Sequence, residues 1–423
     1  MGRVEALRCS SCGREYSPQE VEYCCSSCGE LEGTLEPLYN YDALRREVSR
    51  EGFSRGGELK MDRYFPLLPL KNRELLGELR VGWTPLYKVP RLRAKLGLRG
   101  LFIKDEGLNP SGSLKDRASA VGVARALERG DRAIAVASTG NAAASLAALS
   151  AASGLPSFIF VPRDAPPAKL TQLLIHGAHI FAIRASYDEA FELCVRACER
   201  WGWYCRNTAF NPYMGEGKKT AAFEICEQLS FEAPDRVFLG VGDGCIISGL
   251  WKGFREFHRL GLIGKLPRLT GVQAEGAKPL VCAFEAGKGV ARAARPETLA
   301  DSIRVGVPRD QVKALRAARE SGGGFLAVSD EEILRAMDLL AREAGVFAEP
   351  AGAAGMAGLL RLHRAKELDP EERVLVLVTG NGLKDLKAAQ RAARGRMVEV
   401  EAELSEVERS YQAINNTLER RDS

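Results

Sequence analysis

The chain has 423 residues, 45% of them hydrophobic; this length exceeds the usual limit of one hydrophobic core and predicts two α/β lobes with an appendage. Its 60 Lys and Arg are interleaved with 55 Asp and Glu, so the net charge of +5 is too weak and too dispersed to indicate nucleic-acid binding. No uncharged apolar stretch approaches about 20 residues and the N-terminus lacks a basic-then-apolar signal, so we expect a soluble cytoplasmic protein that spans no membrane.

Cysteines gather at the N-terminus, in the segments 9–12 and 24–28. Each segment ends in a Cys-x-x-Cys pair followed by glycine, and two such pairs roughly a dozen residues apart are typical of a zinc ribbon. Tetrahedral Zn²⁺ takes four thiolates, and the sequence assigns these as Cys9, Cys12, Cys25 and Cys28, with Cys24 as a spare. The site has no open ligand position, so its role would be structural. Disulfides are the alternative, which the scattering of the six other cysteines disfavours.

The predicted ribbon covers residues 1–36, and a polar connector and N-terminal arm at 37–81 lead to a body at 82–395. There, a short apolar strand at 101–103 precedes the turn NPSGSLKDR at 109–117, which contains Lys115. Small residues let a ligand approach the backbone closely, and a lysine can form a Schiff base when its surroundings keep the amine neutral. The alternative interpretation is a surface lysine in an ordinary turn.

Three β-like runs further along the chain each end in a loop rich in small or polar residues. The runs cover residues 133–137, 236–239 and 374–378, and they lead into the loops 138–141, 240–246 and 379–384. Helix patterns follow the first two loops, at 142–152 and 247–259. Ligands of open α/β sheets bind at the carboxyl ends of strands, so we expect these loops to converge on one cleft.

The loop at 240–246 is suited to a phosphate, because its glycines permit a concave run of N–H groups and the helix start adds positive potential. An ordinary strand-to-helix turn is the alternative. The loop is not a dinucleotide fingerprint, since Gly240 and Gly242 lack the third glycine at the required offset.

Strand and helix patterns alternate through the body, which argues for parallel sheets covered on both faces. The segments are 157–161, 169–176, 179–183 and 187–201. Ser329 and Glu332 form a predicted capping box before a helix at 333–344. In the C-terminal helix expected at 396–423, one apolar stripe packs on the protein's own body or, as we favour, on a sister subunit. The stripe consists of Leu404, Val407, Tyr411, Ile414 and Leu418.

Seven short sequence motifs follow one another along the chain in a characteristic order. They are Trp83-Thr84-Pro85-Leu86, Lys104-Asp105-Glu106 ahead of the Lys115 turn, Ser138-Thr139-Gly140-Asn141, Asn211-Pro212 with residues 216–220, Gly242 to Ile246, Glu349-Pro350-Ala351 and Thr379-Gly380. From about residue 82 to 394 the chain thereby resembles the fold-type II pyridoxal-phosphate enzymes, and within them the threonine synthase-like family. The resemblance implies a tryptophan synthase β-like fold of two lobes with parallel sheets, the smaller and mobile lobe at about 122–209.

The resemblance also implies roles for the cofactor site. Lys115 would form the Schiff base with pyridoxal 5'-phosphate and then act as general base. Asn141 would hydrogen-bond the cofactor's phenolic oxygen, although it could simply cap the following helix. Thr379 would face the pyridine nitrogen and leave it largely unprotonated, or could be only a β-branched strand end. The phosphate would lie on Gly242, Asp243, Gly244, Cys245 and Ile246.

For the substrate, the resemblance places the carboxylate at Ser138 and Thr139. Candidates for a substrate phosphate are Lys104, Asn207, Thr208, Asn211 and Lys219. Many threonine synthases carry an arginine just after the Asn-Pro pair, where this chain has Tyr213-Met214, and methionine cannot make that charge-assisted contact. This chain also has one residue more between Asn207 and Asn211 than those threonine synthases have.

The activity implied is that of a carbon-oxygen lyase converting O-phospho-L-homoserine and water to L-threonine and phosphate, in a homodimer. Cysteate synthase or an O-phosphoserine sulfhydrylase is the nearest alternative, followed by threonine dehydratase. An alternative of another class is a zinc-ribbon interaction protein with an inactive body. The intact Lys115 and both ligand loops disfavour it.

Overall fold

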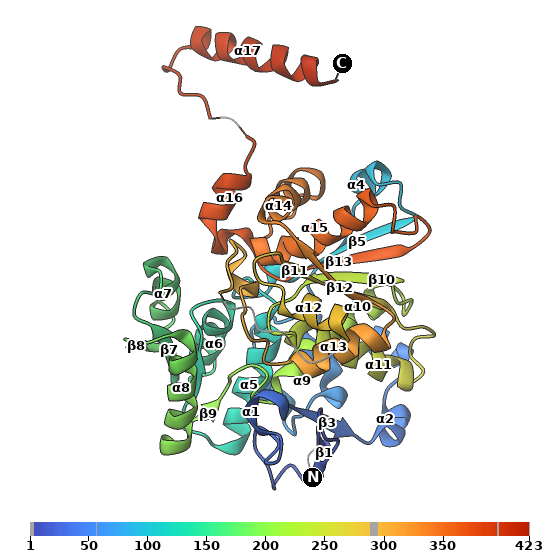
Figure 1. Cartoon of the computed structure of the whole chain (residues 1–423), viewed down its shortest axis with the longest axis vertical. Coiled ribbons are helices and arrows are strands. Elements are labelled where there is room, and N and C mark those ends of the chain that lie inside the picture. Colours follow the sequence, from blue (N-terminus) through green and yellow to red (C-terminus); the bar gives the residue numbers. More distant parts are fainter. Residues whose placement is uncertain (1–3, 56, 288–294, 396, 423) are drawn as a thin grey trace.

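The computed structural model describes residues 4–55, 57–287, 295–395 and 397–422, whose strands form three sheets (Figure 1). The smallest sheet is antiparallel and lies at the N-terminus, in the order β2-β1-β3. Its strands are β1 (Val4–Cys9), β2 (Glu15–Tyr16) and β3 (Leu35–Tyr39). Short helices follow it along the chain: α2 (Tyr41–Glu47), α3 (Arg50–Arg55), η1 (Met61–Leu67) and η2 (Arg73–Leu76).

The largest sheet has the strand order β12-β11-β10-β13-β5-β4, and only β4 runs antiparallel to its neighbour. Its strands are β4 (Leu86–Lys88), β5 (Gly100–Asp105), β10 (Arg236–Gly240), β11 (Arg268–Ala274), β12 (Gly324–Val328) and β13 (Arg373–Val378). Leu375 and Leu377 lie in one hydrophobic cluster, whereas Val374, Val376 and Val378 lie in another. Successive side chains therefore enter cores on opposite faces, as in a parallel sheet covered on both sides.

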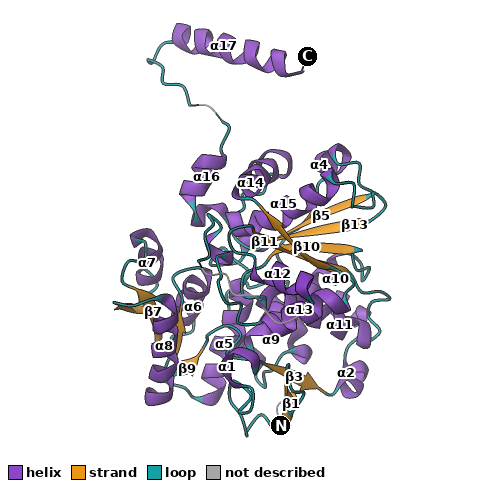
Figure 2. Cartoon of the chain, viewed as in Figure 1, coloured by secondary structure: helices purple, strands orange, loops and turns teal. Residues whose placement is uncertain are grey.

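Helices cover both faces of this sheet (Figure 2). One cluster contains residues of α10 (Thr220–Gln228), α11 (Cys245–Arg259) and α13 (Gln311–Glu320), and the other contains residues of α14 (Asp330–Ala344) and α15 (Pro350–Arg364). The predicted capping box is confirmed, because Ser329 and Glu332 exchange both hydrogen bonds at the start of α14. The other helices of this region are α4 (Pro90–Lys95), η3 (Glu106–Leu108), α9 (Met214–Lys218), α12 (Pro279–Ala286), η4 (Asp301–Ile303), η5 (Gly382–Lys384) and α16 (Leu386–Ala392).

A four-stranded parallel sheet forms the second α/β unit, in the order β8-β7-β6-β9. Its elements are β6 (Ile134–Ala137), α6 (Asn141–Ala152), β7 (Ser157–Pro162), α7 (Pro167–Leu174), β8 (His179–Ile183), α8 (Tyr187–Trp201) and β9 (Tyr204–Cys205). Helix α5 (Lys115–Arg129) packs on α6 of this unit and on α9 beside the larger sheet. The predicted fold class, two α/β units with parallel sheets, is confirmed.

The C-terminal helix α17 (Leu404–Asp422) stands apart from the rest of the molecule (Figure 1). Leu404 and Tyr411 of the apolar stripe are 73% and 64% exposed, so the stripe does not pack on the body of its own chain. The side chain of Leu418 lies outside the described residues. None of the described helices is long and apolar enough to cross a membrane.

Candidate active site

The turn that carries Lys115 is fixed to the end of strand β13. Leu114 N–H donates to Thr379 O at 3.0 Å, Asn381 N–H donates to Gly112 O at 3.0 Å, and Ser113 pairs with Gly380 in an antiparallel bridge. Because β5 and β13 are adjacent parallel strands, the loops at their carboxyl ends meet at one edge of the sheet. The structure thus places Lys115 and Thr379, far apart in sequence, side by side.

Lys115 is half-buried at the first position of α5, where its environment favours the neutral amine. Loss of hydration lowers the pKa of Lys115, the carboxylate of Glu349 acts in the opposite direction, and the guanidinium of Arg206 lowers the pKa further. The net direction is downward. A lysine with a lowered pKa has a larger neutral fraction at physiological pH, which is the form that attacks a carbonyl or accepts a proton.

Asn141 joins the loop of the smaller sheet to this site. Its Nδ2 donates to Glu349 Oε1 at 2.8 Å and to Ser302 Oγ at 3.3 Å. The interpretation of Asn141 as a helix cap is wrong: Asn141 is the first residue of α6, and the N-cap is Gly140, which makes no side-chain cap bond. The Asn141 amide is therefore engaged with the side chains of Ser302 and Glu349 and not with the start of α6.

A pocket opens where these loops meet. Thr139, Asn141, Ser302 and Glu349 line it, together with Lys384 of the loop after β13. Ser138 lies beside the pocket, in the same loop as Thr139, and its Oγ accepts a hydrogen bond from Gly140 N–H at 3.2 Å. The prediction that loops from both sheets converge on one cleft is thereby confirmed for the loops after β6 and β13.

The loop from Gly242 to Ile246 has the geometry of a phosphate cradle. Gly244 has φ +92° and is the N-cap of the 15-residue helix α11. A Cβ on Gly244 would lie 2.6 Å from Ala314 Cβ, so only glycine fits this close turn. The first turn of a helix leaves N–H groups without intrahelical partners and adds positive potential. Asp243 and Cys245 lie close enough to Lys115 to influence its pKa, so the loop and the lysine belong to one site.

Two of the predicted phosphate ligands have structural roles instead. The Lys104 ammonium is fully buried and donates to Glu224 Oε2, Gln228 Oε1 and Thr84 O at 2.7 to 2.9 Å. The Lys219 ammonium is equally buried and pairs with Glu216 and Glu256 at 2.6 and 2.8 Å. Both ammonium groups already have carboxylate partners, so assigning them to a substrate phosphate is a prediction that the geometry does not support.

The segment at 207–211 is only partly available to a ligand. Asn211 uses both ends of its amide within the turn, donating to Cys205 O at 2.7 Å and accepting from Tyr213 N–H at 2.9 Å. Asn207 Oδ1 accepts from Ala137 N–H at 2.8 Å, and Thr208 Oγ1 accepts from Arg206 Nη1 at 2.8 Å. The structure therefore gives Asn211 the role of holding this turn.

Two cations that the sequence does not assign to the site lie near Lys115, although one of them, Lys218, stands within the motif at 216–220. Arg206 acts on the pKa of Lys115, and both Arg206 and Lys115 act on the pKa of Lys218. The sequence offers little signal for either, because Lys218 stands next to Lys219 and only the helix geometry separates their surroundings. The sequence likewise indicates Glu349 only as part of a motif, and not as the partner of Asn141.

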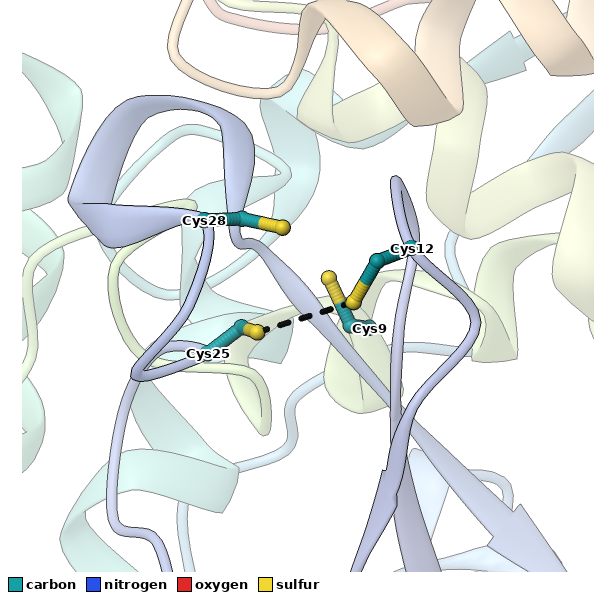
Figure 3. A group of neighbouring side chains, drawn as sticks. All are labelled: Cys9, Cys12, Cys25 and Cys28. Carbon is teal, nitrogen blue, oxygen red and sulfur yellow. Dashed lines mark hydrogen bonds between the residues drawn. The ribbon is translucent and has the colours of Figure 1, made fainter.

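The four predicted zinc ligands come together between β1 and α1 (Gly29–Glu32). The sulfurs of Cys9, Cys12, Cys25 and Cys28 all lie within 4.8 Å of one another, and Figure 3 shows them pointing toward a common centre. Cys24 is not in this group. Gly13 and Gly29 follow the two pairs with φ +75° and +71°, so the chain turns back under the sulfurs as predicted. Four converging thiols fit a tetrahedral Zn²⁺.

Comparisons with known proteins agree with this geometry. Residues 78–380 match the family described as pyridoxal-phosphate dependent enzyme. The chain is 42% identical over 404 residues to the threonine synthase of Methanocaldococcus jannaschii, covering 95% of this chain and 98% of that protein. It is 44% identical over 305 residues to the threonine synthase of Mycobacterium tuberculosis, and this match covers 72% of this chain and 82% of that protein. The processed threonine deaminase isoform 2 of Solanum lycopersicum shares the fold, with TM-score 0.62 at 21% identity over 73% of this chain and 87% of that one.

The chain therefore belongs to the family of pyridoxal-phosphate-dependent enzymes, and the resemblance seen in its motifs is confirmed. Within that family, its similarity to threonine synthases extends over nearly its whole length.

Proposed function

We propose that the protein is a lyase that converts O-phospho-L-homoserine and water to L-threonine and phosphate. The observation that carries this proposal is a lysine of lowered pKa in a turn fixed to the end of β13, in a chain 42% identical to a threonine synthase over 95% of its length. The cofactor site would comprise Lys115, Asn141, Thr379 and the loop from Gly242 to Ile246. Pyridoxal 5'-phosphate, when bound there, supplies an electron sink for a carbanion at the substrate's Cα.

The chain's own residues would then position the substrate and move its protons. The Lys115 amine would accept the proton from Cα and transfer protons at Cβ, because its lowered pKa keeps the amine available as a base. Ser138 and Thr139, at the pocket beside the start of α6, would bind the substrate carboxylate. Asn141 would hold the cofactor's ring oxygen through the amide that now donates to Glu349.

The proposal is tested by measuring phosphate release from O-phosphohomoserine beside O-phosphoserine, each with and without sulfite or sulfide. Formation of threonine from the first substrate supports the proposal, whereas turnover of O-phosphoserine alone overturns it in favour of a β-replacement enzyme. Conversion of threonine to 2-oxobutyrate without phosphate release would instead indicate a dehydratase.

We further propose that Cys9, Cys12, Cys25 and Cys28 hold a structural zinc ion. The ribbon that they form contacts both α/β units. Tyr23 of the ribbon stacks on Phe210, which follows the smaller sheet, with 4.8 Å between the ring centroids. Glu36 of the ribbon forms an ion pair with Arg316 of α13, beside the larger sheet. Removal of zinc should therefore loosen the ribbon and lower the thermal midpoint by at least about 4 °C, while the cofactor's visible band persists.

Metal analysis and thermal melts before and after chelation check this expectation. Cys9→Ser should lose the zinc, and Cys24→Ser, which changes the neighbouring spare thiol, should keep both the zinc and the melting temperature. Zinc retained in Cys9→Ser would contradict the assignment.

A homodimer in which the apolar stripe of α17 packs on a partner is also proposed. Leu404 and Tyr411 are exposed in the single chain, and covering them would stabilise an assembly. Light scattering should give a dimer mass for the full chain and a smaller mass for Tyr411→Glu. A monomeric full chain would contradict it.

A further inference from the structure

Two buried cations near Lys115 lack the partners that buried charges normally have. Arg206 is 0% exposed. Its Nε donates a hydrogen bond to Ser119 Oγ at 3.1 Å, and its Nη1 donates one to Thr208 Oγ1 at 2.8 Å. The remaining nitrogen, Nη2, has no hydrogen-bond partner among the described residues. Lys218 is 1% exposed, and within the same described part of the chain its Nζ makes no hydrogen bond. An unpaired buried charge is costly, so a protein that keeps two of them has a use for both.

The stems of both side chains are held by helices that meet beside the reactive lysine. Arg206 Cγ lies 3.6 Å from the position that a Cβ would take on Gly122 of α5, the helix that begins with Lys115. Lys218 ends α9, and its Cβ lies 2.9 Å from the corresponding position on Gly249 of α11. Burial lowers the pKa of Lys218 to about 8, and the positive charges of Lys115 and Arg206 add to this effect.

The nearby carboxylates already have partners. Asp116 accepts hydrogen bonds from the N–H and the hydroxyl of Ser111, Asp310 is paired with Lys313 at 3.0 Å, and Asp243 accepts from Arg309 N–H at 3.2 Å. No carboxylate among the described residues hydrogen-bonds the unused donors of Arg206 and Lys218, which leaves these donors available to an anion from outside the chain.

Met214 indicates which anion this is. Its Cε lies 3.1 Å from the same Cβ position on Gly122 that Arg206 Cγ approaches, so the two side chains are neighbours. By the resemblance drawn from the motifs, Met214 stands where many threonine synthases carry an arginine that would contact the substrate phosphate. Arg206 thus carries a guanidinium on a stem that lies beside Met214.

We propose that Arg206 and Lys218 bind the phosphoryl dianion of the substrate, in place of the arginine missing at Met214. This inference rests on the proposed function and names the residues that select its phosphorylated substrate. Two fixed cations match a dianion, and the fork of a guanidinium suits phosphate oxygens. When the Cγ–O bond breaks, its electron pair stays on the phosphate oxygen, and the two cations stabilise that charge.

Binding of inorganic phosphate to the holoenzyme, measured by titration calorimetry, tests the proposal together with the KM for O-phosphohomoserine. Arg206→Gln and Lys218→Met should each weaken phosphate binding and raise KM by roughly 10- to 100-fold, the usual effect of losing one charged hydrogen bond. Lys313→Gln removes a cation that is already paired with Asp310 and should change neither quantity. Arg206→Gln combined with Met214→Arg should recover phosphate binding.

Thermal stability separates a binding role from a structural one. Without phosphate, Lys218→Met should melt at or above the wild-type temperature, because it removes an unpaired buried charge, and it should lose the rise in melting temperature that phosphate causes. A lower melting temperature with unchanged phosphate binding would overturn the proposal.

The cofactor's phosphate is the other possible occupant, and affinity of the apoenzyme for pyridoxal 5'-phosphate distinguishes it. Unchanged cofactor affinity in both variants supports the substrate site, whereas lost cofactor affinity with unchanged binding of inorganic phosphate overturns it. If phosphate binding depends on both cations but O-phosphohomoserine is not turned over, the proposed function fails and the anion site stands.

Discussion

Replacement of Lys115 by alanine should lower turnover of O-phosphohomoserine by roughly 10³-fold or more and abolish the cofactor's visible absorbance band. The structure gives the reason: the half-buried amine of Lys115, at the head of α5, has a lowered pKa and interacts with Glu349 of the pocket and with the loop from Gly242 to Ile246. Absorbance spectra of cofactor-saturated protein and a phosphate-release assay measure the two effects.

The matched control is Lys95→Ala, which removes a surface lysine that pairs with Glu343. This variant should keep both the band and the activity. Circular dichroism should show both variants folded, since Lys115 is half-buried at the first position of α5 and alanine is compatible with the helix. A visible band of normal intensity in Lys115→Ala would contradict the assignment of the covalent attachment site.

Replacement of Glu224 by alanine should destabilise the protein by about 3 to 5 kcal/mol or prevent folding, because buried Lys104 would lose its carboxylate partner and buried Arg117 would keep only Glu106. Glu224 accepts two hydrogen bonds from the Arg117 guanidinium, at 2.6 and 2.7 Å, and one from Lys104 at 2.9 Å. Total stabilities of about 5 to 15 kcal/mol leave little room for such a loss. Urea denaturation of both proteins measures the difference.

The buried cluster of Glu224, Arg117 and Lys104 should also make the stability of the folded protein fall in acid. Burial would raise the pKa of Glu224, but the charges of Arg117 and Lys104 outweigh it and lower that pKa from 4.5 to about 2. A carboxylate with a depressed pKa contributes stability above its unfolded value and loses it as the pH falls toward the folded one, so the loss should occur between pH 4.5 and about 2. Glu343→Ala, at an ion pair whose lysine is 59% exposed, should cost less than about 1 kcal/mol. An equal cost at both glutamates would contradict the role assigned to Glu224 in the buried cluster.

Features that depend on nearby residues were predictable from the sequence. The strand, turn and helix around Lys115, the glycine at 244 and the Cys-x-x-Cys pairs follow from local turn chemistry and periodicity, and the structure contains all of them. Convergence of the loops also followed, since the carboxyl ends of parallel strands share one edge.

The electrostatic partners were not predictable in this way. Lys104 pairs with Glu224 and Lys219 with Glu256, across separations that no local pattern reports. Lys218 and Lys219 are adjacent in sequence, yet one ammonium has two carboxylates and the other has none among the described residues, because neighbouring helix positions face different surroundings. Burial and pairing decide whether a lysine supports the fold or serves a ligand, and both are tertiary properties.

The pairing of β5 with β13 has a consequence for how the protein is made. The ribosome must synthesise most of the chain after Gly100–Asp105 before Arg373–Val378 emerges to complete the hydrogen bonds of β5. At about 5 to 20 residues per second, the inner edge of β5 waits for roughly 15 to 55 s. During that time it is an unprotected β-edge, open to pairing with other nascent chains. A chain released before β13 is made would contain Lys115 but would lack the backbone hydrogen bond from Leu114 to Thr379 that fixes its turn.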